Sequence, residues 1–171
     1  MYLLLSDHTI TLPVQYADVI SIDLSRCTIA GCIGCFSCWV KTPGKCIIRD
    51  DATRIYPLIA KSSHIMYISR IRYGTYDIPV KKMLERSIPI QQPFIHLVDR
   101  ETHHVQRQPI RKQAIVLGYG ATDPEEEKVF RSLVDRNAKN MNFRSWKTII
   151  AAKEDIPSIV QQELQRWNGS C

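Results

Sequence analysis

Four cysteines with close, regular spacing are the part of this sequence best suited to chemistry. Cys32, Cys35 and Cys38 form a C-x-x-C-x-x-C run, and Cys46 follows after seven further residues. Thiolates at this spacing can converge on one point without a large fold around them. The residues alone leave four interpretations open: an iron–sulfur cluster, a zinc ion, a redox-active thiol pair, or an inherited loop with free thiols.

The expected compartment favours the metal and redox interpretations. Residues 1–5 lack the basic segment and cleavage site of a signal peptide, and no apolar stretch approaches a membrane span in length. We therefore expect a cytoplasmic protein that does not contact a membrane. In a reducing cytoplasm, closely spaced cysteines indicate metal binding or redox work rather than structural disulfides.

The composition is that of an ordinary globular protein. The 171 residues fit a single domain, 1–171, with 44% hydrophobic and 23% charged residues. The net charge of +6 is carried by scattered residues without interleaved aromatics, so we expect no nucleic-acid partner. No Ser/His/Asp or paired-carboxylate constellation stands out. Hydrolysis is therefore not expected, and no catalytic side chain can be assigned.

Predicted strands alternate with predicted helices along the chain. The strand patterns span residues 3–5, 19–24, 64–68, 114–118 and 148–152. The helix patterns span 52–60, a segment starting near Pro79, one that starts at 122–124 with a capping residue and Pro124, and one that Asp155 caps and that runs to about Trp167. Strands separated by single helices imply an α/β, doubly wound, five-stranded parallel sheet with helices on both faces. Residues 92–109 break this rhythm and predict a β-hairpin insertion.

Such sheets bind ligands at the carboxyl ends of their strands. The cysteine run follows the second predicted strand, so we expect it to overhang this edge. The candidate ligand-binding residues follow the third and fourth main strands: Arg70, Arg72, Tyr73, Gly74, Thr75, Gly118, Tyr119 and Gly120.

These loops have two interpretations. Glycines let a backbone approach a planar ligand closely, and Arg70 with Arg72 could clamp a phosphate bidentately. Alternatively, residues 70–75 form a surface loop in which Gly74 merely supplies a turn.

Three segments resemble the flavodoxin-like NADPH-dependent FMN reductase family, and within it the branch that includes iron–sulfur flavoproteins. The cysteine run with Asp50 and Asp51 is similar to the cysteine loop and acidic helix start of that branch. Residues 73–76 with Lys82 and residues 85–87 resemble its flavin-ring loop and the helix that follows. Residues 137–140 resemble a late helix of the same proteins.

This resemblance implies a flavodoxin-like fold and FMN at the strand ends, with the eight loop residues as its contacts. It also implies a four-iron cluster on Cys32, Cys35, Cys38 and Cys46. The expected activity is that of an FMN-dependent oxidoreductase or electron-transfer flavoprotein supplied by NAD(P)H or a ferredoxin. The expected assembly is a homodimer whose partner helps close the flavin site.

A second hypothesis rests on the shortened beginning of the chain. Only residues 6–18 separate the first two predicted strands, which leaves no room for the usual glycine-rich phosphate loop and helix. The chain would then be a degenerate flavodoxin-like subunit without FMN, acting as a dimerisation or regulatory partner.

Overall fold

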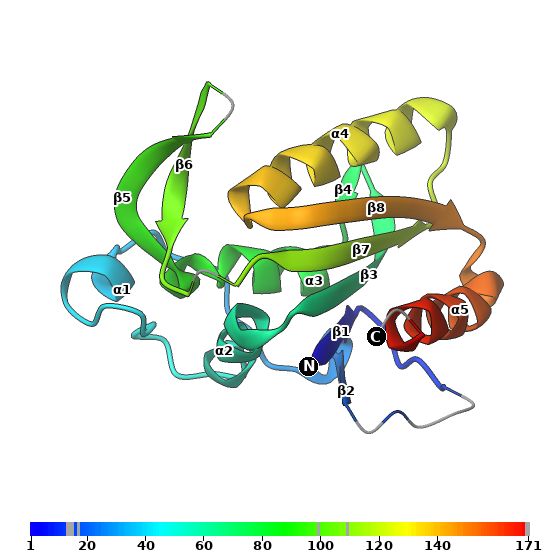
Figure 1. Ribbon diagram of the computed structural model, residues 1–171, viewed down its shortest axis with the longest axis horizontal. Coiled ribbons are helices and arrows are strands. Elements are labelled where there is room, and N and C mark those ends of the chain that lie inside the picture. Colours follow the sequence, from blue (N-terminus) through cyan, green and yellow to red (C-terminus); the bar gives the residue numbers. More distant parts are fainter. Residues whose placement is uncertain (13–15, 17, 99, 109, 170–171) are drawn as a thin grey trace.

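The computed structural model describes residues 1–12, 16, 18–98, 100–108 and 110–169. Its main sheet has parallel strands in the order β2-β1-β3-β7-β8, with a short β4 antiparallel to β3 (Figure 1). The strands of this sheet are β1 (Tyr2–Ser6), β2 (Val19–Asp23), β3 (His64–Arg72), β4 (Thr75–Tyr76), β7 (Lys112–Tyr119) and β8 (Phe143–Ala151). The predicted five-stranded parallel sheet is confirmed.

The burial of β1 explains its continuously apolar sequence. Leu3, Leu4 and Leu5 are fully buried because β1 lies between β2 and β3 with packed layers on both faces. Successive side chains alternate between faces, so Leu3 and Leu5 join one core cluster and Leu4 joins the other.

The helices divide unequally between the two faces of the sheet. They are α1 (Ser37–Val40), α2 (Ala52–Lys61), α3 (Ile78–Glu85), α4 (Pro124–Asn140) and α5 (Ile156–Asn168). Side chains of α2, α3 and α4 fill one core cluster, and those of α5 fill the other. None of the described helices is long and apolar enough to cross a membrane.

The segment between β1 and β2 takes the place of a helix on the α5 face. Among its described residues, 7–12, 16 and 18, none is helical. Instead, Ile10, Leu12 and Tyr16 pack against the core cluster that α5 completes. The short connection therefore buries apolar surface without supplying a helix N-terminus at the end of β1.

The predicted helix starts differ in their outcome. Asp123 caps α4 as expected, since its carboxylate accepts the backbone N–H of Glu126 at 2.8 Å. The prediction that Asp155 caps the last helix is wrong in this respect, because its side chain makes no capping hydrogen bond. A 3-10 turn at 153–155 leads directly into α5, so Asp155 has helical rather than extended backbone.

The predicted hairpin insertion is present between α3 and β7. It consists of β5 (Gln91–Val98) and β6 (Glu101–Gln106), which pair antiparallel as a separate small sheet. Residues 99 and 109 of the predicted insertion lie outside the described residues. Figure 1 shows the hairpin extending from one side of the molecule, with β5 outermost and α1 beside it.

A buried lysine at the start of β7 makes the free energy of unfolding vary with pH in the alkaline range. The Lys112 ammonium donates to the carbonyl oxygens of Ala60 and Ile110, both at 3.1 Å, and burial lowers its pKa to about 8. The unfolded lysine keeps its proton to about pH 10.4, so between these values the unfolded state binds more protons. We expect the free energy of unfolding contributed by this group to rise from pH 8 to 10. Urea unfolding of Lys112→Met should lack this rise, whereas Lys61→Met, at an exposed position, should retain it.

Candidate functional site

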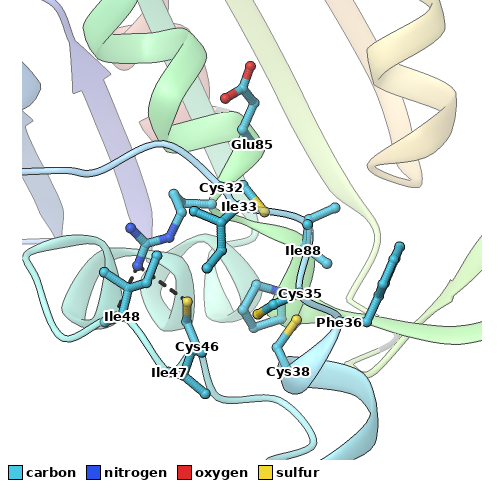
Figure 2. Close-up of a pocket in the computed structure, with 13 residues that line it drawn as sticks. Cys32, Ile33, Cys35, Phe36, Cys38, Cys46, Ile47, Ile48, Glu85 and Ile88 are labelled. Atoms are coloured by element: carbon cyan, nitrogen blue, oxygen red, sulfur yellow. Dashed lines mark hydrogen bonds between the residues drawn. The ribbon is translucent and has the colours of Figure 1, made fainter.

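The four cysteines of the run line one cavity. Cys32, Cys35, Cys38 and Cys46 surround a cavity of about 90 Å³ that is partly open to solvent. Figure 2 shows their side chains around this common space. The other lining side chains are mostly apolar: Ile33, Phe36, Ile47, Ile48, Ile88 and Pro89. The structure thus brings together all four predicted thiols, and we refer to this cavity as the cysteine pocket.

A closed turn returns the chain from Cys38 to Cys46. The backbone N–H of Gly44 donates to the carbonyl of Cys38 at 2.9 Å, and Gly44 has a φ of +81°, which favours glycine. The hydroxyl of Thr42 donates to the carbonyl of Lys45 at 2.8 Å. The seven residues between Cys38 and Cys46 therefore form a hydrogen-bonded turn, which places Cys46 at the same cavity as the other three cysteines.

A buried arginine at the end of α3 forms hydrogen bonds to the segments before and after the cysteine run. Arg86 is 1% exposed, and its guanidinium donates to both Asp50 carboxylate oxygens, at 2.6 and 3.0 Å. It also donates to the carbonyls of Ala30 and Ile48 and, at 3.4 Å, to the sulfur of Cys46. Burial alone would raise the pKa of Asp50, but the hydrogen bonds from Arg86 and Ala30 hold it below its usual value. The sequence offered no signal for this role of Arg86.

The thiols influence one another electrostatically. Burial raises the pKa of Cys38, and negative charge on Cys46, Cys32 and Cys35 raises it further. The pKa of Cys35 is lowered, chiefly by hydrogen bonds from Ser37 and slightly by Lys41. Because thiolates this close repel each other, the four can ionise together only with a compensating positive charge.

Among the described residues, the four thiols line one cavity without forming a site for a single metal ion. In the described part of the chain, no three His, Cys, Asp or Glu side chains are grouped to hold one metal ion. A cluster binds each thiolate through a separate iron, so its ligands surround a volume rather than one point. Arg86, whose buried Nε has no hydrogen-bond partner among the described residues, is also one of the residues that line this volume.

The cysteine pocket does not overhang the carboxyl edge of the sheet, contrary to our expectation. Its lining includes Glu85, Arg86, Ile88 and Pro89, at and beyond the C-terminal end of α3. Helix α3 starts at that edge, where the N–H of Asp77 donates to the carbonyl of Arg70, and runs eight residues, about 12 Å, away from it. Trp39 then holds α1 near the hairpin through a 3.1 Å hydrogen bond to the carbonyl of Gln91.

At the carboxyl edge, the turn after β1 holds a carboxylate. Asp7 accepts the backbone N–H of Arg70 at 2.6 Å and the hydroxyl of Tyr119 at 3.0 and 3.1 Å, and His8 Nδ1 lies 2.7 Å from it. The Asp7 side chain is 4% exposed. In doubly wound folds, this turn and a helix N-terminus normally offer backbone N–H groups to a phosphate. The Asp7 charge opposes a phosphate here, so the phosphate of FMN does not fit at this turn.

Hydrogen bonds to one carboxylate join the loops after β3 and β7. Glu126, in the first turn of α4, accepts the backbone N–H of Thr122 at 2.7 Å and that of Gly74 at 3.2 Å. Both hydrogen bonds lower the pKa of Glu126, and the one from Thr122 has the larger effect.

The sequence did not predict β4. This short strand turns the chain back on β3 and leaves Tyr73 90% exposed.

The predicted flavin contacts do not share one cavity. Arg70, Tyr119 and Gly120 line an open groove at the ends of β7 and β8. Tyr73 and Gly74 line a second cavity beside α4, and Thr75 lines a third, between α3 and α4.

Two predicted contacts have structural partners instead. Arg72 lies 3.7 Å from the Asp77 carboxylate. Gly118 faces the core, where an added Cβ would lie 2.8 Å from Ile71 and Phe130. The absence of a side chain at Gly118 is therefore explained by helix–sheet packing.

A substitution at Gly74 tests the account of the turn between β3 and β4. Its φ is +69°, and an added Cβ would lie 2.5 Å from Val129 of α4. We expect Gly74→Ala to lower the free energy of unfolding by about 1–3 kcal/mol. Gly31→Ala, where a Cβ would meet open space, should change it by less than about 0.5 kcal/mol. Equal effects in urea unfolding would contradict this account of the turn.

Comparisons with known proteins agree on the architecture. No protein-family model and no curated protein matches the sequence. A solved NAD(P)H:quinone oxidoreductase from Methanothermobacter marburgensis matches with a TM-score of 0.61 and 10% identity, over 96% of this chain and 95% of that one. The fold is flavodoxin-like.

Other solved structures support the same assignment. An FMN-dependent NADH-azoreductase from Bacillus anthracis, in complex with FMN, matches with a TM-score of 0.57 and 11% identity, over 94% of this chain and 92% of that one. The Trp repressor binding protein of Bacillus subtilis matches with a TM-score of 0.53 and 15% identity, over 94% of each chain. At these identities the likeness concerns the flavodoxin-like fold alone.

Proposed function

We propose that this chain is an electron-transfer component of the oxidoreductase class, with a four-iron cluster in the cysteine pocket as its redox centre. The observation that carries the proposal is the convergence of Cys32, Cys35, Cys38 and Cys46 on one apolar cavity. The oxidoreductases with the same fold, described above, support the redox class.

The residues around the pocket are suited to hold such a group. A bound cluster would supply one-electron chemistry. The guanidinium of Arg86 places positive charge and an N–H against the Cys46 sulfur, and such a donor beside a ligating sulfur favours the reduced state of a cluster. The isoleucines and Pro89 give the pocket an apolar lining, which strengthens electrostatic interactions there.

Anaerobic reconstitution tests the proposal. The full chain is incubated with ferrous iron, sulfide and a thiol reductant, and then desalted. We expect a brown protein whose broad absorbance decreases on addition of dithionite. A desalted protein that stays colourless would contradict the proposal, and tight binding of zinc with no uptake of iron would favour a structural metal site.

FMN binding is a second candidate, supported by the azoreductase that has this fold and binds FMN. The groove lined by Arg70, Tyr119 and Gly120 lies where flavodoxin-like folds place ligands. The Asp7 carboxylate at the turn after β1 opposes binding of the FMN phosphate there and favours a subunit without FMN instead. We therefore assign no step to FMN, NAD(P)H or a ferredoxin.

Titration with FMN and with riboflavin separates these candidates. Quenching of flavin fluorescence by FMN at micromolar protein would support an FMN-dependent enzyme. Equal quenching by riboflavin would show that the phosphate is not recognised, as the Asp7 geometry predicts. No quenching by either flavin would support the FMN-free electron-transfer subunit.

A further inference from the structure

The outer strand of the hairpin exposes large apolar side chains on both of its faces. Phe94, Ile95 and Leu97 are 67%, 63% and 74% exposed, and Val98 is 37% exposed. Folded monomers rarely expose contiguous apolar surface of this kind without a binding function.

This surface continues onto the cysteine loop through a row of ring contacts. Ile95 is the cross-strand partner of His104, whose ring lies 4.8 Å from that of Trp39. Trp39 in turn lies 5.5 Å from the ring of Phe36. Phe36 is 58% exposed, and Val40 on the same short helix is 76% exposed. We call the side chains of Phe36, Val40, Ile95 and Leu97 the hairpin face.

The edge of β5 is open and carries no charge. β5 pairs with β6 on one side, and no described strand pairs with its other side. Residues 91–98, Gln-Gln-Pro-Phe-Ile-His-Leu-Val, include no Lys, Arg, Asp or Glu. Monomeric proteins usually carry lysine or proline on such an edge, which prevents pairing with another chain. Pro93 lies where the register with β6 shifts, so residues 95–98 have no lysine or proline that would prevent pairing.

We propose that a second copy of this chain covers the hairpin face, by antiparallel pairing of the two β5 strands. A two-fold axis at His96 would place Ile95 of each copy opposite Leu97 of the other, and Phe94 opposite Val98. These two kinds of pair join apolar side chains, as an isologous contact allows, and the axis itself brings the two His96 side chains opposite each other.

The chemistry of the surface favours a second copy over a charged partner. A partner recognised by charge needs complementary charges, and β5 offers none although the chain carries a net charge of +6. Because Phe36 belongs both to the hairpin face and to the lining of the cysteine pocket, this pairing would bring the two pockets of the dimer towards the interface. The proposal does not depend on what the pockets hold.

The oligomeric state of the full chain tests the proposal. Light scattering after size exclusion and sedimentation velocity should show a dimer at micromolar concentration. Leu97→Asp places a charge at the pairing edge and should weaken the dimer about 100-fold or more. Ile78→Asp, at an apolar position that is 55% exposed at the start of α3, should leave the dimer unchanged.

Several results would overturn the proposal. These are a monomeric wild-type chain, or a dimer that survives Leu97→Asp while circular dichroism shows both variants folded. A wild-type monomer that binds neutral phosphatidylcholine vesicles through this face would assign it to lipid instead. Hydrogen exchange gives an independent readout, because the outward amides of 95–98 should be protected in the dimer and exchange faster in Leu97→Asp. Iron content measured on the same samples distinguishes failure of this proposal from failure of the redox centre.

Discussion

Replacing Cys38 with serine is expected to prevent the chain from retaining iron and sulfide after anaerobic reconstitution. Cys38 lines the cysteine pocket and is partly buried, and the other three thiols raise its pKa further after burial has raised it. Loss of an outer-shell partner typically costs 10- to 100-fold in metal affinity, and loss of a ligand costs more. We expect retained iron to fall to background, measured by colorimetric assay after desalting.

Cys27 provides the matched control for this experiment. It lies five residues before Cys32, but its sulfur donates to the carbonyl of Asp23 at 3.4 Å and packs against the core, and it is not among the residues that line the pocket. Cys27→Ser should therefore retain iron at the wild-type level. Equal retention by Cys38→Ser and the wild type would assign the iron to non-specific binding and contradict the proposed centre.

Replacing Arg86 with methionine is expected to lower the free energy of unfolding by about 3–5 kcal/mol. The substitution leaves the Asp50 carboxylate, which is 9% exposed, without its bidentate partner, and it leaves the carbonyls of Ala30 and Ile48 without a donor. Removal of one member of a buried ion pair costs this much because the remaining charge stays buried. Chemical unfolding of the metal-free chain, with circular dichroism as the probe, measures the effect.

The exposed pair of Arg54 and Asp51 supplies the comparison. Arg54 lies 3.0 Å from Asp51 with 65% of its side chain exposed, so Arg54→Met should cost less than about 1 kcal/mol. The Arg86 pair also has a pH signature. Because Asp50 has a lowered pKa in the folded state, its contribution is present above the usual aspartate pKa and lost as pH falls through the folded value. Arg86→Met should reduce this acid-side loss, and two variants of equal stability would contradict the role given to Arg86.

Local sequence patterns were sufficient to predict most of the fold. The apolar run of β1, the start of α4 at Asp123 and the hairpin insertion each depend on neighbouring residues, and the structure confirms them. The close spacing of the C-x-x-C-x-x-C run and the short turn to Cys46 explain why all four cysteines line one cavity, although the described thiols are not grouped around a single point.

Contacts between distant segments could not be predicted in this way. Arg86 and Asp50 are 36 residues apart, and Asp7 meets the N–H of Arg70 across 63 residues. No periodicity or motif links such pairs. The same limitation explains why the cysteine loop was expected at the carboxyl edge: its position is set by Arg86 and Trp39, which hold it beside α3 and the hairpin.

Counting iron and acid-labile sulfide in the anaerobically reconstituted full chain tests the central claim most directly. A four-iron cluster held by one thiolate per iron predicts about four of each per chain. Wild-type protein that retains less than about one iron per chain, with no sulfide, would contradict the assignment of the cysteine pocket as a redox centre.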